Sequence, residues 1–231
     1  MSENFWQLPG LTIRSISVSE MDNIVYLITS LRTGDQVLID AADDEPAIAR
    51  LLATGAADMS ALLPDGTADG GAPVAAPARL GLVVTTHSHW DHVRALAAVA
   101  ASTGARTAAG ADDVADIAVP TDLALSHGDT CGAGDIVLEV IGLRGHTPGS
   151  VALLLRNPDG PDHLFTGDSL FPGGVGNTQK DPARFTQLMD DVTVRIFAAL
   201  PDETVVHPGH GDGTTLGNER PALPDWRARG W

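Results

Sequence analysis

Residues 80–92 read LGLVVTTHSHWDH, an apolar run followed at once by three histidines and an aspartate. The apolar run is short and rich in valine, which predicts a buried strand. Alternate side chains of an extended segment point the same way, so His87 and His89 can reach one cation together. Asp91 and His92 come where the strand ends and a helix begins, which turns them toward a second position close by. We therefore predict a metal-binding turn that can serve two cations.

The composition is typical of a globular protein. Hydrophobic residues make up 43% of the 231 residues, and a chain of this length can hold one large domain. We predict a single domain over residues 1–231, with an exposed loop rich in proline, glycine and alanine near residues 63–78. No apolar run is long enough to span a bilayer, and the first ten residues lack the pattern of a secretion signal, so a cytoplasmic location is expected.

The net charge of the chain disfavours binding to nucleic acid. The formal net charge is −16, from 30 acidic against 14 basic residues. An acidic surface repels phosphate backbones, so we expect neither a nucleic-acid nor a membrane partner. The single cysteine, Cys131, excludes an intramolecular disulfide and is expected to be a buried thiol.

Hydrophobic periodicity predicts strands and helices arranged in two similar α/β halves. A helix over residues 44–53 would place Ile48 and Leu51 on one face, with Gly55 just past its end. The expected strands are 11–18, 24–31, 36–40, 80–85, 136–140, 151–155, 163–166 and 204–206, and further helices are expected after His92 and from Asp181. This order favours sheets packed together inside and helices outside.

Three later turns carry further histidine and aspartate residues that could bind the same cations. His146 stands in the turn GHTPGS at residues 145–150, between two predicted strands, where glycines let the backbone bend around a ligand. Asp168 follows a strand end in FTGDS, and His210 follows another in HPGHG. Each sequence alone is also typical of an ordinary polar turn. Taken together, we expect the strand ends to line one rim of the sheets.

The order and context of these residues resemble the metallo-β-lactamase superfamily, and within it the branch of glyoxalase II, or hydroxyacylglutathione hydrolase. The resemblance implies an α/β fold, an αββα four-layer sandwich in which two mixed sheets pack face to face with helices outside. It also implies a two-metal site at one edge of the sandwich. The implied ligands are His87, His89 and His146 for the first metal, Asp91, His92 and His210 for the second, and Asp168 as a bridge between both.

Such ligands are typical of a catalytic site. Histidine and carboxylate ligands around an open position favour catalytic zinc, so two zinc ions per chain are expected, while iron or manganese is also compatible. Two adjacent metals lower the pKa of a shared water from about 15.7 toward 7, and the resulting metal-bound hydroxide can attack a carbonyl carbon. Asp91 could orient this hydroxide and accept its proton, which makes it the expected catalytic residue. A thiolate, whose thiol has a pKa of about 8.5, leaves with little help from an acid, so a thioester is the expected substrate.

Several residues of this chain differ from those of known branches of the family, and these differences narrow the range of expected substrates. Its β-lactamases commonly carry cysteine where Asp168 stands, and its lactonases carry tyrosine near the position of Phe171. Glyoxalase II binds glutathione through a basic residue near the position of Asn177. The resemblance therefore favours a small-molecule thiol conjugate, the thioester of a low-molecular-weight thiol other than glutathione.

Three alternatives stay open at this point. The chain could be an iron-dependent persulfide dioxygenase, an enzyme that resembles this family and uses one iron at the first site. It could be another esterase of the same fold. It could also be a metal-stabilised binding or scaffolding protein without turnover.

Some residues keep two interpretations. Trp90, which lies between ligands, either walls the substrate pocket or packs in the core. His207 is either a hydrogen-bond partner of a ligand or a structural residue, whereas His127 is expected to be an ordinary turn residue. The segment Leu216–Trp231 covers either the rim of the active site or a partner surface.

Overall fold

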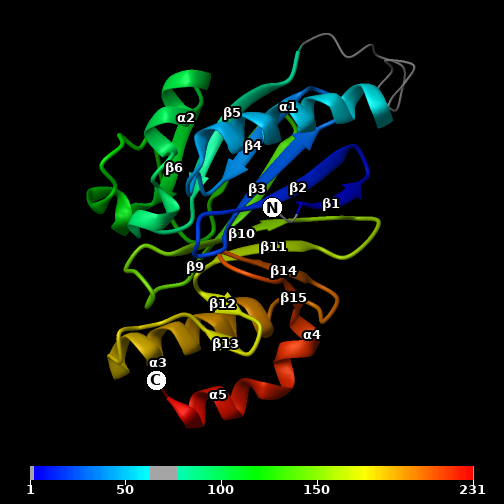
Figure 1. Cartoon of the computed structure of the whole chain (residues 1–231). Helices are drawn as coiled ribbons and strands as arrows, with labels where there is room; N and C mark the ends of the chain where they lie inside the picture. The colour runs from blue at the N-terminus through cyan, green and yellow to red at the C-terminus, as the bar shows by residue number, and fades with distance from the viewer. Residues whose placement is uncertain (1–2, 63–76, 231) are drawn as a thin grey trace.

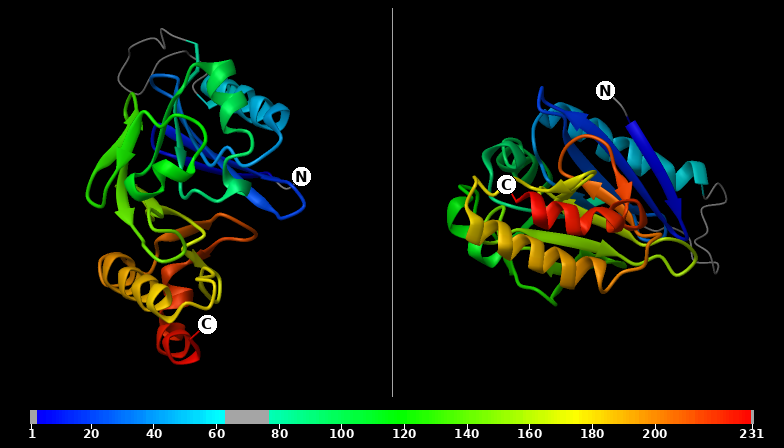
Figure 2. Two further views of the ribbon diagram at one scale, coloured as in Figure 1. Left: turned by 90° about the vertical axis from the view of Figure 1, so that its left-hand side faces the viewer. Right: turned by 90° about the horizontal axis from the view of Figure 1, so that it is seen from below.

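Two mixed sheets pack face to face, and helices cover both outer faces of the pair (Figures 1 and 2). The computed structural model describes residues 3–62 and 77–230. The αββα four-layer sandwich expected from the sequence is confirmed. The loop expected near residues 63–78 falls mainly on residues 63–76, which lie outside the described residues.

The first sheet contains seven strands in the order in which they follow along the chain. These strands are β1 (Glu3–Leu8), β2 (Leu11–Val18), β3 (Asn23–Ser30), β4 (Asp35–Ile39), β5 (Arg79–Thr85), β6 (Arg106–Gly110) and β7 (Leu123–Leu125). Neighbours are antiparallel from β1 to β4 and parallel from β4 to β7. Parallel neighbours need long connections, which contain α1 (Glu45–Leu62), α2 (Leu96–Thr103) and the short helix η2 (Ala111–Asp116).

The second sheet contains six strands in the order β15-β14-β11-β10-β9-β8. These strands are β8 (Thr130–Ala133), β9 (Ile136–Gly142), β10 (Val151–Leu155), β11 (His163–Gly167), β14 (Val205–Pro208) and β15 (Thr214–Thr215). Among the described neighbours in this sheet, only β11 and β14 are parallel. A small hairpin of β12 (Leu170–Phe171) and β13 (Gly174–Val175) follows β11.

The outer face of the second sheet is covered by helices from the last third of the chain (Figure 1). They are α3 (Pro182–Asp191), the π-helical turn η3 (Val192–Phe197), α4 (Leu216–Glu219), η4 (Arg220–Ala222) and α5 (Leu223–Arg229). The buried Trp226 of α5 packs near Phe197, with ring centroids 6.3 Å apart. The C-terminal helices are thus part of the sandwich and belong to its third apolar core.

Strand β3 shows how the layers form. Its side chains alternate between the two faces of the sheet, and both faces are buried. Tyr26 and Ile28 belong to the core between the two sheets, whereas Val25 and Leu27 belong to the core beneath α1 and α2. A strand that is apolar on both faces therefore holds three layers together.

Helix α1 extends to Leu62, so the expected end before Gly55 is wrong. Gly55 faces the sheet, where a Cβ atom would lie 2.6 Å from Oγ1 of Thr29. One turn later, Asp58 accepts hydrogen bonds from Nε and Nη2 of Arg14 at 2.8 and 2.7 Å. The glycine therefore permits a close approach of helix and sheet instead of ending the helix.

Other expected elements are present with small shifts. The predicted strands appear with ends that differ by at most two residues. The helix after His92 begins at Leu96, because the short turn η1 (Trp90–His92) comes first. The expected start at Asp181 is confirmed, since Oδ1 of Asp181 accepts hydrogen bonds from the backbone N–H groups of Ala183 and Arg184.

The sequence analysis did not predict β1, β6, β7, β8 or the C-terminal helices. The missed strands span only three to six residues each, and β6 is rich in alanine and glycine. Cys131 is buried as expected, and burial together with Asp129 raises the pKa of its thiol to about 11. Among the helices of the described residues, none has both the length and the apolar character needed to cross a membrane.

Candidate metal centre

The seven histidine and aspartate side chains singled out in the sequence meet at one edge of the sandwich. The turn of residues 87–92 follows β5, and the turns of His146, Asp168 and His210 follow β9, β11 and β14. These last three strands run in one direction, because β10 is antiparallel to both β9 and β11, and β14 is parallel to β11. Their ends therefore fall at the same edge.

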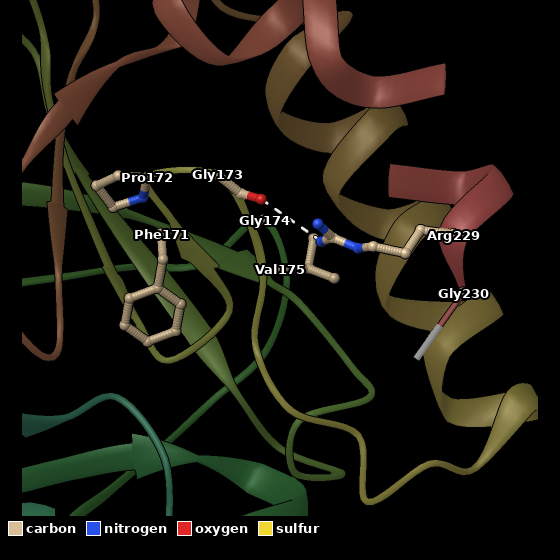
Figure 3. Close-up of a pocket in the computed structure, with 7 residues that line it drawn as sticks. All are labelled: Phe171, Pro172, Gly173, Gly174, Val175, Arg229 and Gly230. Carbon is tan, nitrogen blue, oxygen red and sulfur yellow. Dashed lines mark hydrogen bonds between the residues drawn. The ribbon is translucent and has the colours of Figure 1, made fainter. Parts of the chain in front are cut away.

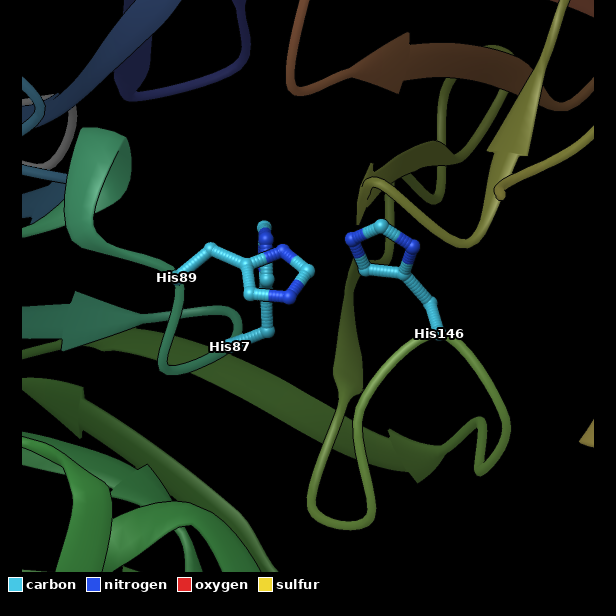
Figure 4. Close-up of side chains that lie close together, drawn as sticks. All are labelled: His87, His89 and His146. Carbon is cyan, nitrogen blue, oxygen red and sulfur yellow. The ribbon is translucent and has the colours of Figure 1, made fainter. Parts of the chain in front are cut away.

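His87, His89 and His146 form the first group, and each offers a nitrogen within 4.8 Å of the other two. Figure 4 shows their rings, from two facing turns, pointing toward a common centre. The ring centroids lie 4.5 to 4.8 Å apart. Nε2 of His87 and Nε2 of His146 are buried without a hydrogen-bond partner. Burial lowers the pKa of both side chains, which favours neutral imidazoles that can bind a cation.

Asp91, His92 and His210 form the second group. Nε2 of His210 lies 3.3 Å from Oδ2 of Asp91, and Nε2 of His92 lies 3.6 Å from the same oxygen. The Nε2 atoms of His92 and His210 are only 3.2 Å apart. Two imidazole lone pairs at this distance repel each other unless a proton or a cation lies between them, so this group also suits a cation.

Asp168 lies between the two groups. Its Oδ2 is 3.6 Å from Nε2 of His146 and 3.4 Å from Nε2 of His210. Burial alone would raise the pKa of Asp168, but the neighbouring imidazoles of His210 and His92 outweigh this effect and hold that pKa well below its usual range. Asp168 thus stays a carboxylate, placed where it can contact cations of both groups.

The other ring nitrogen of several histidines is fixed by an acceptor. Nδ1 of His146 donates to the carbonyl oxygen of Asn177, and Nδ1 of His210 donates to that of Met21, both at 2.8 Å. Carbonyl oxygens can only accept, so Nδ1 carries the hydrogen and the lone pair of Nε2 points into the centre. This arrangement is the usual support of a metal-binding histidine.

Asp40 supports two further ligands and was missed in the sequence analysis. Its Oδ2 accepts hydrogen bonds from Nδ1 of His92 at 2.9 Å and from Oγ1 of Thr86 at 2.8 Å. Because the Thr86 hydroxyl donates to Asp40, its oxygen is free to accept from Nδ1 of His87, 3.1 Å away. Burial would lower the pKa of His92, but the carboxylates of Asp40 and Asp168 together outweigh this effect and raise that pKa to about 10. An aspartate directly after the apolar strand β4 was the available signal.

Asn23 is a second residue that the sequence analysis missed. Its Nδ2 donates to Oδ2 of Asp91 at 2.9 Å and lies 3.5 Å from Nε2 of His210. Asn23 is fully buried at the start of β3 and pairs with His210 in an isolated β-bridge. It therefore connects the first sheet to the second ligand group.

The structure excludes one of the two interpretations of Trp90 and one of those of His207. Trp90 is 60% exposed, with the Arg94 guanidinium 4.9 Å from its ring centroid, so the core-packing alternative is wrong. His207 hydrogen-bonds His163 at 2.8 Å and stacks on Phe165, which makes it part of the core between the sheets. His127 lies in an exposed turn, as expected.

A pocket lies beside the second group, between the β12–β13 hairpin and the end of α5 (Figure 3). Its volume is about 490 Å³, and Phe171, Pro172 and Val175 supply apolar walls. The ring centroid of Phe171 is 6.5 Å from that of His210, so this pocket begins next to the candidate ligands. The Arg229 guanidinium reaches the opposite wall, where Nη2 lies 3.5 Å from the carbonyl oxygen of Gly173. The C-terminal segment thus contributes to the wall of this pocket.

The donor set fits metal ions. Three imidazoles in one group and two imidazoles with a carboxylate in the other leave room for additional ligands, as catalytic sites require. The buried, unpartnered Nε2 atoms and the unpartnered Oδ1 of Asp168 would be costly without a cation or another partner. The geometry is consistent with a binuclear metal centre.

Comparison with known proteins gives the same picture. The metallo-β-lactamase superfamily matches residues 23–210, a range that contains all seven side chains. A hydroxyacylglutathione hydrolase of Ruegeria pomeroyi is 34% identical over 191 residues, which cover 82% of this chain and 62% of that protein. The chain thus spans about 62% of the length of this curated relative.

Two solved structures of similar proteins share more than 25% sequence identity with this chain. ETHE1 from Myxococcus xanthus is 30% identical with a TM-score of 0.68, over 94% of this chain and 84% of that one. TTHA1623, solved in a di-iron-bound form, is 27% identical with a TM-score of 0.65, over 89% of this chain and 96% of that one.

Proposed function

Because this chain belongs to the metallo-β-lactamase superfamily, we propose that it is a metal-dependent hydrolase that cleaves the thioester of a low-molecular-weight thiol. The observation that carries this proposal is the position of Asp168, whose Oδ2 lies 3.6 Å from His146 of the first group and 3.4 Å from His210 of the second. A carboxylate between two sets of imidazoles can contact both cations of a two-metal site. Glyoxalase II-like names among the relatives support the reaction class.

Two zinc ions are the proposed metals. The seven ligands are imidazoles and carboxylates without thiolate, which zinc accepts readily in catalytic sites. Iron or manganese accepts the same ligands, and the di-iron form of TTHA1623 supports iron as the main alternative. When bound, two such cations would polarise the substrate carbonyl and lower the pKa of a water molecule toward neutrality.

Asp91 is proposed as the proton acceptor. Nδ2 of Asn23 holds its Oδ2 at 2.9 Å, so the carboxylate keeps one orientation beside His92 and His210. Asp168 already shares its charge among the imidazoles of both groups, which lowers its pKa and makes it a poor base. The proton of the attacking water would therefore pass to Asp91.

The pocket beside His210 supports a thioester substrate. Its described lining residues are apolar side chains, glycines, a proline and Arg229, and these carry no group that readily releases a proton at neutral pH. A leaving alkoxide would need such a group, whereas a thiolate leaves with much less help. We assign this pocket to the thiol part of the substrate, with Arg229 facing a carboxylate or hydroxyl group of that thiol.

An iron-dependent persulfide dioxygenase is the second candidate. His87 and His146, with Oδ2 of Asp168 at 3.9 and 3.6 Å from their Nε2 atoms, supply two imidazoles and a carboxylate. This set is typical of non-haem iron oxygenases. Metal analysis together with oxygen uptake separates the candidates: one iron per chain and sulfite formed from a persulfide indicate the dioxygenase, whereas two metals without oxygen uptake indicate hydrolysis.

The test is a steady-state assay of the purified, zinc-loaded protein on S-acyl conjugates of several thiols, with the matching oxygen esters alongside. We expect thioesters to be hydrolysed faster than oxygen esters. Asp91→Asn, which retains the shape of the side chain, should lower kcat by about 100-fold or more. Uniform inactivity on thioesters would overturn the proposal, and faster cleavage of oxygen esters would indicate another esterase. A binding or scaffolding role predicts that Asp168→Ala leaves every measured property intact.

A further inference from the structure

A buried aspartate outside both ligand groups connects the turns that carry the first group. Asp113 lies in η2 and is fully buried, with 0% of its surface exposed. A buried carboxylate is costly unless several donors bind it. Its Oδ1 accepts a hydrogen bond from the backbone N–H of Gly149 at 2.6 Å, and its Oδ2 accepts from the backbone N–H of Ser88 at 2.8 Å and from Oγ1 of Thr147 at 2.6 Å.

These three donors belong to two different turns. Ser88 stands between His87 and His89, whereas Thr147 directly follows His146 and Gly149 lies two residues further on. One carboxylate thus binds both turns, which Figure 4 shows facing each other across the first group. The second group is supported elsewhere, since Asp40 holds His92 and the Met21 carbonyl holds His210.

The backbone around Asp113 is built for close approach. A Cβ atom on Gly149 would lie 2.4 Å from the backbone nitrogen of Asp113. A Cβ atom on Gly110, just before η2, would lie 1.8 Å from the carbonyl oxygen of Gly149. Both positions admit only glycine, so η2 and the His146 turn stay in direct contact. The distance between the two ligand-bearing turns is therefore set through Asp113.

We propose that Asp113 is a positioning residue of the first ligand group, and that it sets the geometry in which His87, His89 and His146 bind one cation. Imidazole nitrogens bind zinc at about 2.0–2.1 Å, so a small shift of one turn against the other weakens binding. Residues that orient ligands in this way typically change metal affinity by about 10–100-fold when substituted. This inference rests on the proposed metal centre.

The test measures zinc affinity, by competition with a chromophoric chelator, in two backgrounds that each retain one ligand group. His210→Ala removes a ligand of the second group, and His89→Ala removes one of the first. Asp113→Asn should weaken zinc binding about 10–100-fold in the His210→Ala background and less than about twofold in the His89→Ala background. Equal weakening in both backgrounds, or none in either, would overturn the proposal. Absence of zinc binding by His210→Ala alone would overturn the proposed centre and this inference with it.

A milder pair of variants covers the case in which Asp113→Asn does not fold. Thr147→Val removes the hydroxyl that donates to Asp113 while nearly retaining the volume, and Thr147→Ser keeps the hydroxyl. We expect Thr147→Val to weaken zinc binding selectively in the His210→Ala background, and Thr147→Ser to restore most of the affinity. A merely structural role would give no such rescue by serine, and equal affinities of the two variants would therefore overturn the proposal.

Discussion

Oδ2 of Asp40 accepts a hydrogen bond from Nδ1 of His92 at 2.9 Å, although 52 residues separate the two in sequence. Both side chains are almost completely buried. Oδ1 of the same carboxylate accepts from the backbone N–H of Thr86 at 2.7 Å, at the start of the metal-binding turn. Asp40 thus orients His92 and increases the basicity of its Nε2, which faces the second ligand group.

We expect Asp40→Asn to weaken metal binding by the second group about 10–100-fold, because the imidazole loses its charged acceptor. The measurement is zinc affinity in the His89→Ala background. The control is Asp190→Asn, which makes the same change of charge at an exposed residue that pairs with Arg227. An unchanged affinity in Asp40→Asn, or an equal loss in the control, would show that the Asp40 contact does not act on the site.

Gly55→Ala should destabilise the protein even though alanine is the better helix former. Alanine gains up to about 1 kcal/mol in helix propensity over glycine. The new Cβ atom, however, would lie 2.6 Å from Oγ1 of Thr29 and 2.8 Å from Cδ2 of Leu27, and overpacking of this kind costs about 1–3 kcal/mol. Urea unfolding should show a net loss of up to about 2 kcal/mol. Ser60→Ala, at an exposed position of the same helix, should change stability little, and a stabilised Gly55→Ala would contradict this packing.

The pair of His163 and His207 should make stability fall in mild acid. Burial lowers the pKa of His207 to about 3, and it lowers the pKa of His163 as well. Below about pH 6.5 the unfolded chain binds a proton at His207 and the folded chain does not, so the free energy of unfolding falls as the pH drops from about 6.5 toward 3. For one such histidine the expected slope is about 1.4 kcal/mol per pH unit.

The measurement compares urea unfolding of the chelator-treated protein and of His207→Gln at pH 7, 6 and 5. The titrating groups that do not contact His207, including the seven candidate ligands, are common to both proteins and cancel in the comparison. As the pH falls, the free energy of unfolding of the variant should decrease less steeply than that of the unsubstituted protein. The two slopes should differ by about 1 kcal/mol per pH unit. If the free energy of unfolding falls equally steeply with pH in both proteins, His207 binds its proton equally well in the folded and the unfolded chain, and the prediction is wrong.

Local features of the sequence, together with the family resemblance, singled out the seven side chains that meet at the candidate site. The alternation of His87 and His89 after an apolar strand, and the glycine-rich turns at later strand ends, are visible without any knowledge of the fold. The support of the site was not visible. Asp40 and Asp113 are two among 30 acidic residues, and each acquires its role from partners at least 25 residues away.

The difference between local signals and contacts distant in sequence also explains the errors in predicting the fold. Gly55 carries a stop signal that is often right, and only the neighbouring Thr29, on a distant strand, shows why a glycine is needed within the helix. Strands β6 and β7 have little hydrophobic alternation and form because the growing parallel sheet offers them a partner. Sequence patterns therefore indicated the elements that carry a clear apolar face. They missed the strands that form only because a neighbouring strand offers hydrogen-bond partners.

Arg229→Gln should distinguish the proposed thiol pocket from an accidental surface hollow. The guanidinium lies across a pocket that begins beside His210, and a charge-assisted hydrogen bond contributes about 1.5–3 kcal/mol. For a thioester whose thiol carries a carboxylate, KM should rise about 10-fold or more while kcat stays nearly unchanged, because the interaction is the same in the bound substrate and in the transition state. A thioester of a neutral thiol should be hydrolysed equally well by both proteins. Arg227→Gln, in the same helix but not among the residues that line the pocket, is the matched control. If KM rises equally for both thiols, or equally in the control, the thiol does not bind beside Arg229.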